Sequence, residues 1–391
     1  MGSLIAVLFL AGMAFAQSDS SSVTQTGNNQ KATVSQSTNM YIQKSSITQS
    51  NSSNVASVSQ NSENGAPQTA TVIQDGVGNQ STVSQTMTGS NVDNTSGNVA
   101  YMEQTGNGNV SRQTANATNW NGQSEQGVQQ GNNNNLAQVM NGGYTKYASA
   151  TQTGNSNVAS QTLNGGDFEY TTIWQTGNGN YASQSLSGAN NGYFGNDKHN
   201  LGQVRITQTG NYNRATQTIN STIGFNYSDH GVISSKGDNN SAIQNLTGSS
   251  IAAEAVQTGN YNTASQTVSG SNNANLGFTT DITQAGNYNV ARTNQVGDEN
   301  TSAISQTHDY NTTTLSQSGD MNSAAFTQSG DNNAIYATQS NGMNTATVSQ
   351  LGNMNLVHLT QDPGAVSTII QTGSGNIANV SQTGGLPAQG N

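Results

Sequence analysis

Residues 284–361 read QAGNYNVARTN QVGDENTSAIS QTHDYNTTTLS QSGDMNSAAFT QSGDNNAIYAT QSNGMNTATVS QLGNMNLVHLT Q, in which an 11-residue repeat runs from each glutamine to the next. A glycine usually stands two residues after the glutamine, and an asparagine always stands five residues after it. A small or slender residue follows at position seven and usually an apolar one at position nine. An internal repeat of this kind indicates that the chain is built by stacking one structural element.

The spacing within the repeat identifies that element. Positions five, seven, nine and eleven differ by two, which is the side-chain period of a β-strand. The segment Gln-x-Gly-x-x between strands is typical of a tight turn, because glycine adopts positive φ freely and Asn or Asp tolerates it. Two repeats make one rung, a strand-turn-strand-turn loop of about 22–23 residues. The sequence therefore predicts an all-β, amyloid-like β-solenoid of stacked strand-turn-strand rungs.

One face of each predicted strand points inward, and the turns recur at fixed places. The predicted inward ladder comprises Gln284, Asn289, Ala291, Gln295, Asn300, Ile304, Gln306, Asn311, Leu315, Gln317, Asn322, Ala324, Phe326, Gln328, Asn333, Gln339, Asn344, Ala346, Val348, Gln350, Asn355, Leu359, Gln361, Gln371, Asn376, Ala378, Val380 and Gln382. The predicted turn glycines are Gly27, Gly76, Gly106, Gly154, Gly177, Gly210, Gly259, Gly286, Gly297, Gly319, Gly330, Gly352 and Gly373.

Stacking explains why these inward residues are polar. Rungs stacked about 4.8 Å apart bring identical Asn and Gln side chains above one another. Their amides then donate to one neighbour and accept from the other, as in the side-chain ladders of cross-β structures. A buried amide is satisfied in this way, whereas an unpaired one costs about 1–3 kcal/mol.

The composition of the 391-residue chain agrees with a repeat protein and excludes several classes. Hydrophobic residues make up 31 % and charged residues 7 %, too few for a conventional core and for a typical disordered chain. The net charge is −10, and the nine Lys and Arg form no basic stripe, so nucleic-acid binding is not expected. There is no cysteine. The four histidines are far apart in sequence, so neither an enzyme nor a cofactor is predicted.

The first segment is predicted to be a secretory signal peptide, residues 1–16. Leu4 to Phe15 is an apolar run too short to span a membrane, and Ala14-Phe15-Ala16 precedes polar residues. A membrane anchor is the alternative interpretation, and no other stretch is apolar enough to cross a membrane. Residues 17–391 are predicted to form a single continuous solenoid, most regular over 284–382, with loop excursions at 188–200 and 220–234.

In the middle third two inward positions exchange their residues. In the repeat that starts at Gln152, glutamine stands at position nine (Gln161) and the apolar residue at position eleven (Leu163). Both positions keep the same parity, so both side chains are still expected to face inward. The same exchange occurs at Gln184 and Leu186, Gln217 and Ile219, Gln244 and Leu246, and Gln266 and Val268.

The repeat resembles a known family. The pattern Gln-x-Gly-x-x-Asn-x-Ala-x-x-x-Gln, found at residues 317–328 and again at 371–382, is similar to the curlin repeat of bacterial curli subunits. The resemblance covers nearly the whole chain after the predicted signal peptide. It implies a secreted functional amyloid that adds end to end into cell-surface biofilm fibres. It also implies a nucleator subunit and export through a dedicated outer-membrane pore with accessory proteins as partners.

Self-assembly is also expected from the fold alone. A stack of strands exposes an unpaired edge at each end, and such edges template further strands unless they are capped. The sequence offers only short polar or Gly/Pro segments there. The chain is therefore expected to be a homopolymer that is not embedded in a membrane. The alternative is a capped monomeric solenoid acting as an adhesin or an ice-binding protein.

Residues of the turns allow further interpretations. Asp298, Asp309, Asp320 and Asp331 follow the glycine position of consecutive repeats. They are candidate gatekeepers, since like charges in neighbouring rungs slow premature stacking. A row of calcium sites and a simple turn preference are the alternatives, and turn preference is favoured. Three turns have the sequence Gly-Asn-Tyr-Asn, with tyrosines at Tyr212, Tyr261 and Tyr288. These tyrosines form either a surface strip that binds sugars or dyes, or simply solvated aromatic side chains of the turns, and the second interpretation is favoured.

Overall fold

The computed structural model of the chain describes residues 5–10, 19–38, 42–62, 67–88, 97–118, 122–143, 146–166, 169–189, 204–222, 230–271 and 280–383. All regular elements of these residues are β-strands. The chain divides into two compact units, unit 1 (residues 1–194) and unit 2 (residues 195–391). Both have the same architecture, and the predicted all-β solenoid is confirmed.

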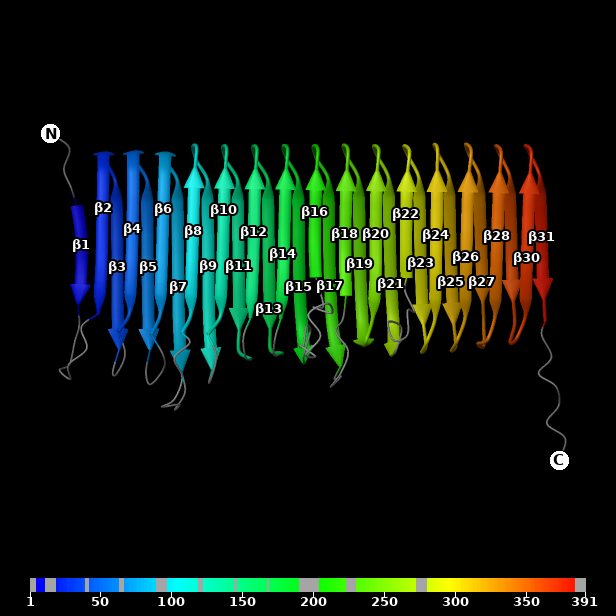
Figure 1. Ribbon diagram of the computed structural model, residues 1–391, viewed down its shortest axis with the longest axis horizontal. Coiled ribbons are helices and arrows are strands. Elements are labelled where there is room, and N and C mark those ends of the chain that lie inside the picture. Colours follow the sequence, from blue (N-terminus) through cyan, green and yellow to red (C-terminus); the bar gives the residue numbers. More distant parts are fainter. Residues whose placement is uncertain are drawn as a thin grey trace, which may run out of the picture. The chain divides into compact units, whose positions relative to one another are not determined.

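Unit 1 is built from parallel strands in two sheets (Figure 1). The odd-numbered strands form one sheet and the even-numbered strands the other, so each strand pairs with the strand two places away in the chain. The strands are β1 (Ile5–Leu10), β2 (Ser20–Asn28), β3 (Lys31–Thr38), β4 (Lys44–Ser52), β5 (Val55–Ser62), β6 (Thr69–Val77), β7 (Gln80–Thr88), β8 (Val99–Thr105), β9 (Val110–Thr118), β10 (Ser124–Gln130), β11 (Asn135–Asn141), β12 (Tyr147–Thr153), β13 (Val158–Asn164), β14 (Tyr170–Thr176) and β15 (Tyr181–Ala189).

Unit 2 repeats this arrangement, again with odd-numbered and even-numbered strands in separate parallel sheets. Its strands are β16 (Val204–Thr209), β17 (Arg214–Thr222), β18 (His230–Lys236), β19 (Ser241–Ser249), β20 (Ala252–Thr258), β21 (Thr263–Ser271), β22 (Thr280–Ala285), β23 (Val290–Val296), β24 (Thr301–Thr307), β25 (Thr312–Ser318), β26 (Ser323–Ser329), β27 (Ala334–Gln339), β28 (Thr345–Leu351), β29 (Leu356–Gln361), β30 (Val366–Thr372) and β31 (Ile377–Gln382).

The length of a rung is the sequence separation between residues in register on paired strands. Gln284 and Gln306 are 22 residues apart, as predicted for two 11-residue repeats. Rungs of unit 1 are often longer, with 24 residues between Gln25 and Gln49 and 30 between Gln74 and Gln104. The additional residues lie in the connections between strands, so the in-register pairing of the strands is unchanged.

The turns need glycine for two physical reasons. Every predicted turn glycine has positive φ, from 90° to 133°. At Gly154, a Cβ atom would also lie 2.0 Å from the carbonyl oxygen of Gly177 in the next rung. The backbone of successive turns therefore approaches too closely for a side chain. His308 replaces a glycine of this row and adopts a φ of 70°, in the region that disfavours residues other than glycine.

The core lies between the two sheets of each unit. Buried and more exposed residues alternate along each interior strand, as the period of two requires. Ile304, Leu315 and Phe326 are among the fully buried apolar side chains of unit 2. Gln306 of one sheet donates to the Thr313 hydroxyl of the other sheet, so polar contacts also cross the interior.

Three predicted segments lie partly outside the described residues. Within the predicted signal peptide, residues 5–10 form β1, which pairs with β3. Of the predicted loop at 188–200, residues 188–189 end β15. Of the predicted loop at 220–234, residues 220–222 end β17 and residues 230–234 belong to β18. No helix suited to crossing a membrane is found in the described part of the chain.

Candidate functional site

The inward glutamines form continuous amide ladders. In the even sheet of unit 2, Nε2 of each glutamine donates to Oε1 of the glutamine one rung further, at 2.8–2.9 Å, through Gln284, Gln306, Gln328, Gln350 and Gln371. The odd sheet has a second ladder, with bonds of 2.6–3.1 Å through Gln295, Gln317, Gln339, Gln361 and Gln382. Most of these Nε2 atoms also donate to a backbone carbonyl, such as Gln306 to Val290. These ladders satisfy the buried glutamine amides of β22 to β31 in unit 2.

Unit 1 contains equivalent ladders. Its even sheet links Gln25, Gln49, Gln74, Gln104, Gln129, Gln152 and Gln175 by bonds of 2.7–2.9 Å. Its odd sheet has two shorter ladders, Gln36 to Gln60 to Gln85 and Gln113 to Gln138 to Gln161 to Gln184. The amide ladder is thus a property of both units.

The exchange of glutamine and apolar residue interrupts the odd-sheet ladder between β7 and β9. Gln85 of β7 pairs in register with Ala115, while Val83 pairs with Gln113. The Oε1 atom of Gln113 consequently has no hydrogen-bond partner, although it is buried. After this step the odd-numbered strands β9, β11, β13 and β15 share the new order, and Gln161 and Leu163 are both fully buried.

In unit 2 the original order returns between β21 and β23. Gln266 pairs in register with Thr293, and Val268 pairs with Gln295. Gln266 Nε2 donates to the backbone carbonyl of Thr280 instead of to a glutamine. The exchanged repeats thus occupy the odd sheet alone, with Gln217, Gln244 and Gln266 in a ladder of their own.

Inward asparagines satisfy the backbone of the turns. Oδ1 of Asn289 accepts the backbone N–H of Asn311 at 2.9 Å, and Oδ1 of Asn311 accepts that of Asn333 at 3.0 Å. Nδ2 of Asn289 donates to the carbonyl of His308 in the adjacent turn at 2.7 Å. Each side chain bridges two rungs at the corner where the chain reverses. The predicted inward residues are buried, except that Asn376 and the last-strand residues Ala378, Val380 and Gln382 are half-buried.

Three buried charged residues were missed by the sequence analysis. Lys146 and Glu169 lie one rung apart in the inward column that also contains Gln123, and they form a fully buried ion pair of 2.8 Å. Glu125 of β10 is also fully buried, and the backbone of Thr114 is the one group that favours its charged form. Burial raises the pKa of the Glu125 carboxyl well above its ordinary value. In the sequence, these three residues could have been recognised as charged residues at inward positions of the repeat.

The four turn aspartates accept backbone hydrogen bonds from the preceding rung. Oδ1 of Asp320 accepts the N–H of Asp298 at 2.9 Å, and Oδ1 of Asp331 accepts that of Asp309 at 3.0 Å. Alternate aspartates therefore lie in the same column. The role as gatekeepers remains a prediction. The described residues contain no cluster of three His, Asp or Glu side chains that could hold a metal ion.

Turn tyrosines of unit 2 stack into a short aromatic row. The ring centroids of Tyr261 and Tyr288 lie 4.8 Å apart, those of Tyr288 and Tyr310 lie 4.9 Å apart, and both pairs are parallel to within 1°. Tyr310 was missed because it follows His308-Asp309 instead of Gly-Asn. All three tyrosines adopt positive φ.

Strand β2 of unit 1 and strand β31 of unit 2 have open inward faces. In β2, Ser21, Val23 and Gln25 are only half-buried, and the Gln25 Oε1 atom has no hydrogen-bond partner. In β31, Ala378 and Val380 are likewise half-buried, because no described strand covers them.

Comparison with known families finds a match within unit 2. The family model of the curlin associated repeat matches residues 309–340. The chain contains a curlin associated repeat. The matched curlin repeat includes β25, β26 and β27, together with part of both amide ladders of unit 2. A search of curated proteins finds no match to this chain.

Proposed function

We propose that the protein is a structural, non-enzymatic subunit that is secreted and self-assembles end to end into extracellular curli-like amyloid fibres. The curlin associated repeat at residues 309–340 supports this type of subunit. The observation that carries the proposal is the match between the first and the last rung of the chain.

The inward residues of these two rungs are nearly identical. In the even sheet, β2 presents Ser21, Val23 and Gln25, and β30 presents Ser367, Ile369 and Gln371. In the odd sheet, β3 presents Ala32, Val34 and Gln36, and β31 presents Ala378, Val380 and Gln382. A second copy placed with its β2 and β3 on β30 and β31 continues each inward row in register.

The hydrogen-bonding groups at the two ends are complementary. Within each ladder, Nε2 of one glutamine donates to Oε1 of the next glutamine along the chain. Gln371 at the end of the even-sheet ladder uses one amide hydrogen for the Leu356 carbonyl. Its second amide hydrogen matches the unpartnered Oε1 of Gln25 in the next copy. Addition of a subunit therefore satisfies a buried acceptor and covers half-exposed apolar side chains.

Strand β1 covers the β3 edge to which a second copy would add. Residues 5–10 pair with β3 from Lys31 to Gln36, so they occupy the edge that a second copy needs. Removal of the predicted signal peptide, residues 1–16, leaves that edge open. We therefore propose that only the processed chain adds efficiently, with a nucleator subunit and an outer-membrane secretion pore as further partners.

Assembly is tested by incubating the purified chain that begins at Gln17. Fibres should appear by electron microscopy and diffract at about 4.8 Å and about 10 Å, the strand and sheet spacings of cross-β structure. A chain that stays monomeric during long incubation contradicts the proposal and favours a capped adhesive solenoid.

The register of the junction has a separate test, because the chain contains no cysteine. The proposed register pairs Ser381 with Ser35 of the next copy, and both side chains are exposed. Neighbouring strands about 4.8 Å apart are within the Cα separation that a disulfide spans. Fibres of the Ser35→Cys/Ser381→Cys variant should oxidise to a series of covalent oligomers. Fibres of either single variant should give covalent dimers at most. A double variant that forms fibres but no series of covalent oligomers refutes this register.

A further inference from the structure

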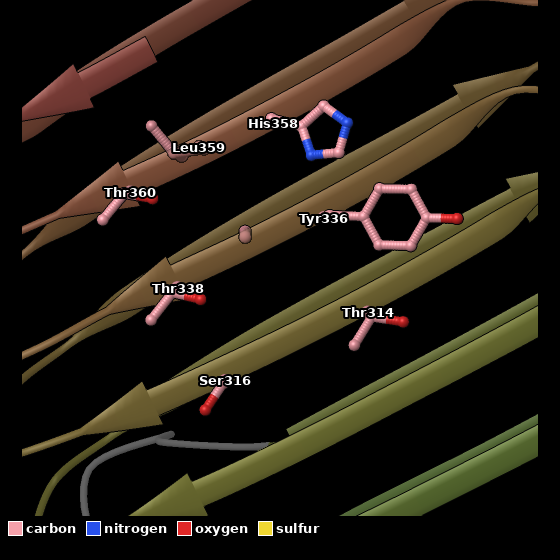
Figure 2. Close-up of a pocket in the computed structure, with 8 residues that line it drawn as sticks. Thr314, Ser316, Tyr336, Thr338, His358, Leu359 and Thr360 are labelled. Carbon is pink, nitrogen blue, oxygen red and sulfur yellow. The ribbon is translucent and has the colours of Figure 1, made fainter. Parts of the chain in front are cut away.

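A hollow lies on the outer face of the odd sheet of unit 2, away from the amide ladders. It spans β25, β27 and β29 and has a volume of about 190 Å³ (Figure 2). The residues that line it are Thr314, Ser316, Tyr336, Ala337, Thr338, His358, Leu359 and Thr360. Neither the fold nor the proposed assembly requires a hollow here, because the outer face takes no part in the stacking of rungs.

Two aromatic rings form one side of the hollow. Tyr336 and His358 are in register on neighbouring strands, with ring centroids 5.2 Å apart and ring planes 16° from parallel. Figure 2 shows both rings face-on, each beside its own strand. Both side chains are exposed, and Tyr336 leaves 42 % of its surface accessible. Exposed, nearly parallel rings offer an apolar surface to a flat ligand.

A row of hydroxyl groups forms the other side. Ser316, Thr338 and Thr360 are in register on three consecutive strands of the sheet. Their hydroxyls consequently repeat at the strand spacing of about 4.8 Å, and each can both donate and accept hydrogen bonds. The row runs across the strands, parallel to the line that joins Tyr336 to His358 (Figure 2).

Charge and size restrict the ligand. The lining contains no Lys, Arg, Asp or Glu, so it offers no fixed countercharge to an ionic ligand. Pockets that enclose drug-sized molecules have volumes of about 300–1,000 Å³, so this hollow is too small for that mode of binding. A ligand must therefore lie along the face and touch it with one side.

We propose that this hollow is a binding site for a neutral polysaccharide of extended, β-linked sugars that runs across the strands. The apolar C–H faces of sugar rings would lie on Tyr336 and His358, and ring hydroxyls would pair with Ser316, Thr338 and Thr360. The regular row of hydroxyls fits a sugar chain better than it fits a planar aromatic ligand, which has no repeating polar groups along its edge.

The test is co-sedimentation of the full chain with insoluble β-1,4-glucan, in buffer with and without soluble β-1,4-linked oligosaccharide as competitor. The wild-type chain should bind, and the oligosaccharide should release it. Tyr336→Ala should weaken binding about tenfold, as expected for the loss of one aromatic contact. Tyr336→Phe should bind like the wild type because it keeps the ring, and Thr338→Val should bind a few-fold more weakly.

Two controls make the outcome decisive. Trp174→Ala removes an exposed aromatic side chain from β14 of unit 1, outside the hollow, and should leave glucan binding unchanged. Coiled α-1,4-glucan should not bind, because its rings cannot lie flat along the row. The proposal is overturned if the glucan does not bind, or if Tyr336→Ala and Trp174→Ala bind equally. It is also overturned if only a planar aromatic dye binds in a Tyr336-dependent manner.

Discussion

Replacement of Gln328 by leucine tests whether the amide ladders stabilise the stack. Oε1 of Gln328 accepts from Gln306 Nε2 and from Thr313 Oγ1, each at 2.8 Å. Its Nε2 donates to Gln350 Oε1 at 2.9 Å and to the Thr312 carbonyl at 3.1 Å. Leucine has a similar size but makes none of these bonds.

The magnitude follows from the groups that lose their partners. Gln350 Oε1 loses a donor and Thr313 Oγ1 loses an acceptor, whereas Gln306 Nε2 keeps its bonds to the Val290 carbonyl and Thr313. Two unsatisfied buried groups cost about 2–6 kcal/mol together. Burial of leucine returns about 1.5–3 kcal/mol. The net loss is about 2 kcal/mol, and it should be local because each rung contacts mainly its neighbours.

Hydrogen–deuterium exchange of the soluble chain, read by mass spectrometry, measures this local loss. Backbone amides of β24, β26 and β28 should exchange about thirtyfold faster in Gln328→Leu, while strands of unit 1 should be unaffected. The matched control is Thr327→Leu, which changes an exposed residue of the same strand and should shift stability by less than about 0.5 kcal/mol. Equal exchange in the two variants would refute a stabilising role for the ladder.

Three further predictions concern unit 1 and are checked by urea unfolding of the soluble chain. Gly154→Ala should lower the unfolding midpoint well below that of Gly165→Ala. A Cβ atom at Gly154 would lie 2.0 Å from a carbonyl oxygen, whereas a Cβ atom at Gly165 would have no atom within 4 Å. Similar midpoints for the two variants would contradict the close approach at Gly154. Lys146→Met should cost about 3–5 kcal/mol by removing the cation beside the buried Glu169 carboxylate, and the double variant with Glu169→Leu should recover most of it. Burial raises the pKa of Glu125, so its carboxyl destabilises the fold increasingly as pH rises above its unfolded pKa of about 4.3. Glu125→Gln should therefore stabilise the chain at pH 7 and change little at pH 4, and an equal effect at both values would contradict this.

Much of the fold could be predicted because the repeat encodes it locally. The spacing of Asn289, Ala291 and Gln295 has the period of a strand, and the parity of a side chain does not depend on distant contacts. Gly286 and its equivalents marked the turns for the same reason, since positive φ is a property of a single residue. The exchanged pair Gln161 and Leu163 could be placed inward by parity alone.

Other features depended on which rungs become neighbours. Lys146 and Glu169 are separated by one rung of sequence, and only the pairing of β12 with β14 makes them a buried ion pair. Gln113 has an unpartnered oxygen only because Ala115, and not a glutamine, is in register with Gln85. The long connections of unit 1 change the rung length, so such neighbours could not be read from a fixed interval.

The sequence by itself determined the strands, their inward faces and the positions of the turns, because these follow from spacing within a single 11-residue repeat. The tertiary structure decided the separation of odd and even strands into two sheets. For the same reason, the tertiary structure placed all the exchanged repeats in one sheet and formed the hollow beside Tyr336 and His358. Those features arise when residues about 22 or more positions apart are brought to one strand spacing, and that register is set by the stacking of whole rungs.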